Sequence, residues 1–343
     1  MVQCASQKSS CGVQKIPQES AVRRVSPEDD SGGQELPQKS VVPCDLPENI
    51  RKLIDGKPFK TDDIGRSGSQ IFVFDDCVLK IVELRDKAIR DKNDETVRVM
   101  RWLDGKLPVP KVLCYECAGG CADSGCARGT GDSAGGGENS AGCEIGGAQN
   151  AGGVRQYLLM SRVPGKMSCD TYYLERPREL VRLLASALKM LWSIDLQGCP
   201  RNRTIETELE EAKFRVGNNL VDVSDSEPET FGKDGFANPT ALLRWLQEHK
   251  PDYEPVLSHG DFCLPNVFIE NGRISGFIDL GDTGIGDKWR DIALCYRSLK
   301  HNFDGTYGGK VYPDFNPDML FEELGIEPNR DKIRFYILLD ELF

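Results

Sequence analysis

Three oxygen-bearing side chains flank a short hairpin that the sequence predicts between residues 258 and 281. The segment reads SHGDFCLPNVFIENGRISGFIDLG, with Asp261 five positions before Asn266 and Asn266 13 positions before Asp279. Two β-rich runs within it meet at an Asn-Gly dipeptide, which is typical of a two-residue hairpin turn. A fold for this chain must therefore place one aspartate before a small hairpin and another directly after it.

Residue types at this spacing indicate phosphoryl transfer from ATP. That chemistry needs one carboxylate to meet the acceptor hydroxyl, while an amide oxygen and a second carboxylate hold Mg²⁺ against the phosphates. Asp261, Asn266 and Asp279 match these three parts. The protein-kinase pattern H-R-D-x4-N followed by D-F-G has the same mechanics, with Gly260 here in place of its Arg and Leu280 in place of its Phe. The alternative is that all three are ordinary polar residues of a hairpin.

The first half of the chain offers candidates for holding the phosphates. Lys80 stands alone in the apolar run CVLKIV and could supply a fixed cation, although a lone strand lysine is often a solvated edge residue. Ser67 lies in a Gly-containing turn whose backbone N–H groups could meet a phosphate. Glu95 on the next predicted helix could pair with Lys80. It could also be an exposed helix carboxylate, and Asp91 and Asp94 compete for the role.

The order of patterns predicts an α+β fold with a strand-rich first half and a helical second half. We expect a disordered tail over 1–45, a first lobe over 46–165 and a second lobe over 166–343. A Gly/Cys-rich stretch at 117–153 buries too little apolar surface to fold and reads as a flexible insertion. Apolar periodicity predicts helices at 46–54, 87–103, 177–195, 239–249, 287–299, 318–324 and 330–342.

Composition narrows the function classes. The net charge of −11 argues against a general nucleic-acid binder and is compatible with a cationic ligand. Apolar runs are too short for a membrane helix, and the first residues lack the apolar core of a secretory signal, so we expect a cytoplasmic protein with no membrane partner. The 13 cysteines then read as thiols. Zinc binding at Cys114, Cys117, Cys121 and Cys126 is the alternative for part of them.

Several longer motifs resemble one family, the aminoglycoside 3'-phosphotransferases, within the kinase-like small-molecule phosphotransferases. The resemblance runs from about residue 46 to Phe343, apart from the Gly/Cys-rich insertion. Its motifs are WLDGKLPVPKVL (102–113), YLLMS (157–161), the 258–281 segment, GIGDKWRDIALCYRS (284–298) and FYILLDELF (335–343). The resemblance implies a two-lobed protein-kinase-like fold and an ATP- and Mg²⁺-dependent enzyme that phosphorylates the 3'-hydroxyl of aminoglycosides, conferring antibiotic resistance.

The resemblance also implies a role for each matched residue. Asp261 becomes the catalytic aspartate, Asn266 and Asp279 the metal ligands, and Lys80 and Ser67 contacts to the ATP phosphates, with Glu95 as the partner of Lys80. Backbone atoms of a hinge over 160–163 would hold adenine, and carboxylates would hold the ammonium groups of the drug. The implied hinge residues are Ser161 and Val163, and the implied substrate residues are Glu229 (or Glu227), Asp340, Glu341 and Phe343.

Two departures from the family pattern leave alternatives open. Asp282 stands where members of the family often carry Arg, which adds negative charge near the phosphates. The position of the family's lysine-pairing glutamate is Thr96, one place after Glu95. A kinase for another small amino alcohol or amino sugar, or a binding module built on a kinase-like core, therefore remains an alternative.

Overall fold

The computed structural model describes residues 46–62, 69–84, 87–119, 153–224 and 226–343. The predicted tail 1–45, Ser67 and most of the predicted insertion lie outside these residues. In the described part of the chain, no helix is long and apolar enough to cross a membrane.

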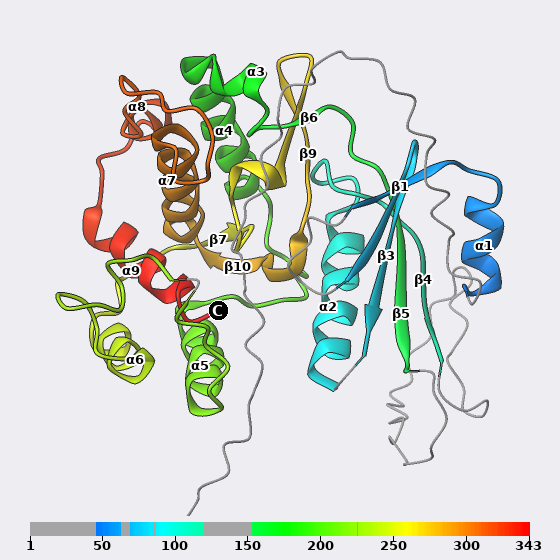
Figure 1. Cartoon of the computed structure of the whole chain (residues 1–343), viewed down its shortest axis with the longest axis horizontal. Coiled ribbons are helices and arrows are strands. Elements are labelled where there is room, and N and C mark those ends of the chain that lie inside the picture. Colours follow the sequence, from blue (N-terminus) through cyan, green and yellow to red (C-terminus); the bar gives the residue numbers. More distant parts are fainter. Residues whose placement is uncertain (1–45, 63–68, 85–86, 120–152, 225) are drawn as a thin grey trace, which may run out of the picture.

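The first lobe is an antiparallel sheet with one helix on each side (Figure 1). Strand order is β1-β2-β3-β5-β4, and helix α2 lies between the sheet and the second lobe, whereas α1 lies on the far side. The elements are α1 (Glu48–Ile54), β1 (Phe59–Asp62), β2 (Gln70–Phe74), β3 (Cys77–Glu83), α2 (Lys87–Leu103), β4 (Val112–Ala118) and β5 (Arg155–Ser161). β4 thus includes the first two residues of the stretch that was expected to be an insertion.

Alternation along β3 separates the two faces of this sheet. Cys77, Leu79 and Ile81 are buried in a small apolar core under α1, which contributes Ile50 and Ile54. Successive strand side chains point to opposite faces. Lys80 therefore points to the face that carries α2.

The second lobe is mainly helical and holds two small sheets. One sheet joins β6, β8 and β9, and the other joins β10 and β7. The elements are β6 (Lys166–Met167), α3 (Thr171–Leu174), α4 (Pro177–Trp192), α5 (Ile205–Gly217), α6 (Pro239–Glu248), β7 (Pro255–Ser258), η1 (Leu264–Asn266), β8 (Val267–Glu270), β9 (Arg273–Phe277), η2 (Leu280–Asp282), β10 (Gly284–Asp287), α7 (Lys288–Asp304), α8 (Met319–Leu324) and α9 (Arg330–Asp340).

Helix α2 contributes to the core of the second lobe. Val99, Met100 and Leu103 of α2 are buried in the same apolar cluster as Leu184 and Leu188 of α4. Because burial of apolar side chains is the main stabilising contribution in a fold, α2 is held by both lobes.

Most predicted helices are confirmed within a few residues, but the four-residue helix α3 and the longer helix α5 were missed. Thr204 caps α5 by accepting a hydrogen bond from the backbone N–H of Thr207. Ile205, Leu209 and Ala212 form its buried face. This spacing is a helical signal, and many glutamates between these residues obscure it.

Candidate active site

The loop after β7 carries Asp261, and a buried aspartate of α7 holds its backbone. Asp291 accepts hydrogen bonds from the N–H of His259 (2.9 Å), the N–H of Gly260 (3.0 Å) and the hydroxyl of Ser258 (3.0 Å). Arg290 donates from Nε to the carbonyl of Gly260 at 2.9 Å. The sequence alone did not assign a role to Asp291 or Arg290, although both lie in the motif GIGDKWRDIALCYRS (284–298).

Asp261 is tied directly to Asn266. The Nδ2 of Asn266 donates to the carboxylate Oδ2 of Asp261 at 2.9 Å and to its backbone carbonyl at 3.0 Å. Burial raises the pKa of the Asp261 carboxyl, and the negative charges of Asp340 and Asp279 add to that effect, against the opposing effects of His259 and Asn266. The carboxylate is therefore oriented and more basic than an exposed aspartate.

The β8–β9 hairpin brings Asn266 and Asp279 to one end. The N–H of Ile278 donates to the carbonyl of Asn266 at 3.0 Å, which aligns the residues that begin and follow the hairpin. Asp279 is exposed and has left-handed backbone angles, φ 57° and ψ 62°. A non-glycine residue in this region stores strain and is often found at functional sites.

The donor set fits a hard divalent cation. Asn266 uses its amide nitrogen on Asp261, which leaves its amide oxygen available. Among the described residues, no hydrogen bond or ion pair engages the Asp279 carboxylate. An amide oxygen beside a carboxylate is the chemistry that Mg²⁺ selects.

Lys80 lies on β3 opposite Leu158 of β5 and borders a cavity of about 40 Å³ between the sheet and α2. Thr96, Tyr115 and Gln156 also line this cavity. Lys80 thus faces the interior of the lobe and is not an edge residue.

The expected ion pair between Lys80 and Glu95 is not formed. Glu95 pairs instead with Arg201 of the second lobe, with Oε2 to Nε at 3.1 Å. Within the described ranges, no carboxylate lies within salt-bridge distance of Lys80. Arg201 follows Glu95 by more than a hundred positions, so no local pattern could have predicted this contact.

Backbone hydrogen bonds hold only part of the segment between the lobes. The N–H of Ser161 donates to Lys111 O (2.9 Å) and that of Arg162 to Asp76 O (3.0 Å). In the part of the chain that the structure describes, the N–H of Val163 has no partner. The Val163 side chain is buried against Gly276 of β9. The predicted hinge therefore offers a backbone donor at Val163.

The acidic end of α9 lies beside the Asp261 loop, but arginines already pair with it. Asp340 contacts Arg290 at 3.3 Å and also forms a short ion pair with Arg297. Glu341 lies 3.6 Å from Arg297. Each of these carboxylates therefore has a cationic partner on α7, and their role in holding ammonium groups stays a prediction.

Phe343 and the loop before α6 complete this end of the lobe. The ring of Phe343 lies 5.7 Å from the guanidinium of Arg203 and 5.8 Å from that of Arg215. The N–H of Glu227 donates to Glu341 at 3.0 Å, whereas Glu229 is exposed and no hydrogen bond or ion pair of its side chain is seen in the described part of the chain. The geometry thus favours Glu227, the alternative to Glu229, as the loop residue at the acidic end.

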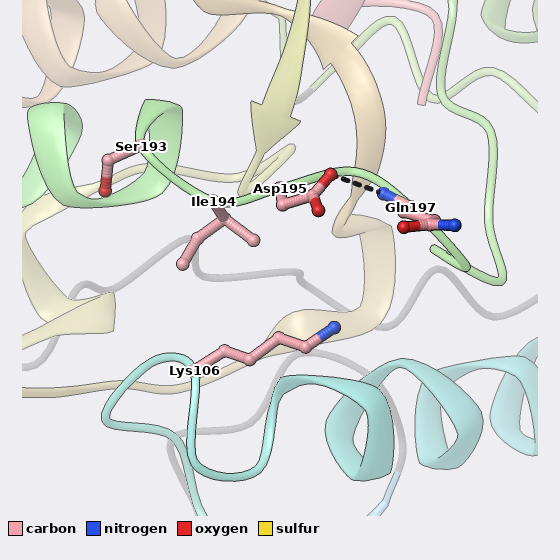
Figure 2. A pocket seen from close by; sticks show the side chains of 5 residues that line it. All are labelled: Lys106, Ser193, Ile194, Asp195 and Gln197. Atoms are coloured by element: carbon pink, nitrogen blue, oxygen red, sulfur yellow. Dashed lines mark hydrogen bonds between the residues drawn. The ribbon is translucent and has the colours of Figure 1, made fainter.

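A separate hollow of about 510 Å³ lies away from these residues. Figure 2 shows Lys106, after α2, facing the linker that follows α4. Ser193, Ile194, Asp195 and Gln197 form the opposite wall. None of the predicted site residues lines this hollow.

Comparison with known proteins places the chain among phosphotransferases. The sequence model of a family described as the phosphotransferase enzyme family matches residues 60–312. An aminoglycoside 3'-phosphotransferase of Enterococcus faecalis is 32% identical over 300 residues, covering 86% of this chain and 97% of that relative.

Solved structures show the same fold. Aminoglycoside-3'-phosphotransferase of type VIII superposes with a TM-score of 0.63 at 22% identity, covering 86% of this chain and 97% of that chain. An aminoglycoside phosphotransferase of Streptomyces rimosus, solved with ADP and streptomycin, has a TM-score of 0.60 at 20% identity, covering 85% and 95%. The predicted two-lobed, protein-kinase-like α+β fold is confirmed.

Proposed function

This chain belongs to the phosphotransferase enzyme family, and from that premise we propose that it transfers the γ-phosphoryl group of ATP to the 3'-hydroxyl of aminoglycosides. The phosphorylated aminoglycoside would no longer act as an antibiotic, so this phosphorylation would confer resistance. Because ATP is held inside cells, we place the reaction in the cytoplasm. The observation that carries the proposal is the cluster of Asp261, Asn266 and Asp279 at the open end of the β8–β9 hairpin.

Asp261 is the catalytic residue in this proposal. Its carboxylate would accept a hydrogen bond from the attacking hydroxyl and orient it toward the phosphorus atom. The Asn266 N–H restricts the rotation of that carboxylate by bonding to Oδ2, and Oδ1 would then accept from the substrate hydroxyl. Burial raises the pKa of the Asp261 carboxyl, which makes it a better proton acceptor.

Asn266 and Asp279 would hold Mg²⁺ through the amide oxygen and the carboxylate. The metal would neutralise charge on the phosphate oxygens. Lys80 would place its ammonium on the phosphates from the other lobe, and the N–H of Val163 would donate to adenine. Ser67 is proposed from sequence alone as a contact to the phosphates, because it lies outside the described residues.

Substrate recognition is proposed at the acidic end of α9. Arg290 and Arg297 form ion pairs with Asp340 and Glu341 and partly neutralise them. The negative electrostatic potential there is therefore weaker than the two carboxylates alone would produce. Ammonium groups would add to these pairs as further hydrogen-bond donors. Glu227 extends the same surface through its backbone contact with Glu341.

Comparing kanamycin with tobramycin, which lacks the 3'-hydroxyl, tests the proposal. ADP release would be measured with ATP and Mg²⁺ in a coupled assay. We expect turnover with kanamycin, and inhibition without turnover by tobramycin. Equal turnover of both drugs would move the reaction to another hydroxyl, and turnover of neither would refute the proposed substrate class.

A further inference from the structure

The linker between α4 and α5 runs alongside helix α2 of the other lobe. Trp102, near the end of α2, donates from Nε1 to the carbonyl of Gln197 at 3.3 Å. Further along, the linker is attached to β10, because the N–H of Ile285 donates to Arg201 O (2.9 Å) and the N–H of Arg203 donates to Ile285 O (2.7 Å). The linker therefore has a fixed backbone where it passes between α2 and the loop after Asp279.

Arg201 in this linker bonds to both lobes at once. Its Nε donates to Glu95, and its NH2 group donates to Lys92 O and to the hydroxyl of Thr96, each at 3.1 Å. Its NH1 group donates to Leu280 O at 3.3 Å and to Gly281 O at 2.7 Å. These contacts use all five N–H donors of a guanidinium.

The bonds of Arg201 reach both sides of the proposed phosphate site. Leu280 and Gly281 directly follow Asp279, so their carbonyls set the path of the backbone that carries this carboxylate. Thr96 lines the same small cavity as Lys80. The side chain is only 4% exposed, so its bonds are shielded from water.

A second ion pair joins the same two elements. Lys92 of α2 lies 3.1 Å from Asp282 of η2, and Arg203 lies 3.4 Å from the same carboxylate. Burial would raise the pKa of Asp282, but the charges of Lys92, Arg203 and Arg290 outweigh burial and hold the pKa at about 2. Asp282 therefore faces three cations and stays ionised.

We propose that Arg201 is a positioning residue that fixes the distance between the two halves of the phosphate site, the Lys80 side and the Asp279 side. This inference rests on the proposed function. Arg201 touches neither nucleotide nor acceptor in this proposal. It acts through α2 and through the backbone of Leu280 and Gly281. A planar guanidinium donates hydrogen bonds from several nitrogens at fixed angles, so it can bond to α2 and to the backbone after Asp279 together. The single nitrogen of a lysine ammonium cannot reproduce that arrangement.

The test compares Arg201→Met and Arg201→Lys with Arg98→Met, which removes an exposed arginine from α2. Amide hydrogen exchange is measured on the full chain without ligands. For Arg201→Met we expect at least tenfold faster exchange in α2 and in residues 280–283, with α9 unchanged. Arg201→Lys should recover part of the protection, and Arg98→Met should match the wild type.

A milder variant guards against misfolding. Glu95→Ala with Thr96→Val removes two of the five Arg201 bonds at half-exposed partners and leaves Arg201 in place. We expect faster exchange in α2 in this variant too, with a smaller change than in Arg201→Met.

Kinetics distinguish positioning from a loss of stability. With kanamycin, Arg201→Met should lower kcat by roughly tenfold or more, because small displacements of reacting groups are costly. It should raise the Mg²⁺ concentration needed for half-maximal rate, while the KM for kanamycin changes less than about twofold.

Two results would overturn the inference. One is unchanged exchange in α2 or in residues 280–283 in Arg201→Met. The other is equally faster exchange throughout the protein, which would make Arg201 an ordinary stabilising residue. If the wild type failed to phosphorylate kanamycin, the proposed function would fall, and the exchange data would still decide whether Arg201 joins the two elements.

Discussion

The amide Nδ2 of Asn266 donates a hydrogen bond of 2.9 Å to the carboxylate Oδ2 of Asp261. Asn266 thereby orients the proposed catalytic carboxylate with its amide nitrogen, and its amide oxygen stays available for the proposed metal ion. The spacing of five positions allows this contact, because η1 turns the chain so that the Asn266 side chain meets Asp261.

Replacing Asp261 with alanine should remove most of the turnover. The positioned carboxylate contributes roughly 10²- to 10⁴-fold to proton transfer in enzymes of this kind. We expect kcat with kanamycin to fall by about that factor in Asp261→Ala, while the affinity for ADP with Mg²⁺, measured by calorimetry, stays within about threefold. A variant with near wild-type kcat would show that the site is assigned wrongly.

Replacing Asp279 with asparagine should weaken nucleotide binding only when Mg²⁺ is present. The variant keeps the shape of the side chain and removes the charge that a hard cation requires. Glu270→Gln is a matched control, since Glu270 is an exposed carboxylate on the same hairpin. Calorimetric titration with ADP should show at least about tenfold weaker binding in Asp279→Asn and no change in the control. The same loss in both variants would argue against a metal at Asp279.

The acid side of the pH–rate profile should depend on Asp340. Burial raises the pKa of Asp261, and the charge of Asp340 raises it further. In the proposed reaction Asp261 acts as the ionised carboxylate, so activity should fall as the pH drops through that pKa. Asp340→Asn removes one negative charge and leaves Arg290 and Arg297 less neutralised, and both changes should lower the pKa of Asp261. The acid limb of kcat/KM should therefore move to lower pH. A shift to higher pH would contradict this electrostatic assignment.

Replacing Gly260, in the loop that carries Asp261, should destabilise the protein more than replacing Gly272 in the β8–β9 turn. Its φ is +84°, and a Cβ there would lie 2.3 Å from the carbonyl oxygen of Asp282. Gly260→Ala should cost about 1–2 kcal/mol for the left-handed backbone and about 1–3 kcal/mol more for the overlap. Gly272→Ala shares a positive φ of +70° but meets nothing within 4 Å, so it should cost only the first part. Equal losses of Tm in the two variants would show that the contact with Asp282 is not limiting.

Local patterns were enough to predict the elements that carry the reacting groups. The apolar alternation of β3, the periodicity of α2 and the turn of the β8–β9 hairpin are each contained in a short segment. The Asp261–Asn266–Asp279 cluster could be predicted because all three residues flank that one hairpin. The short β10 was missed, since Gly284–Asp287 has little strand propensity and forms by pairing with β7.

Contacts between distant parts of the chain could not be predicted. Glu95 and Arg201 meet where the two lobes are in contact, and Asp340 meets Arg290 and Arg297 where α9 packs on α7. No local pattern in a single sequence indicates such pairs, because tertiary packing determines which charged residues come within ion-pair distance. The same reason explains why the pairing of the acidic residues of α9 was missed.

The most direct test of the central claim is the position of the phosphate on the product. Kanamycin would be incubated with ATP, Mg²⁺ and either the wild type or Asp261→Ala, and the product examined by ³¹P–¹H correlation NMR. We predict a single phosphate on the 3'-oxygen with the wild type and at least about a hundredfold slower formation of that product with Asp261→Ala. A phosphate on another oxygen, or the same product at the same rate from both proteins, would contradict the proposed role of Asp261 and the proposed reaction.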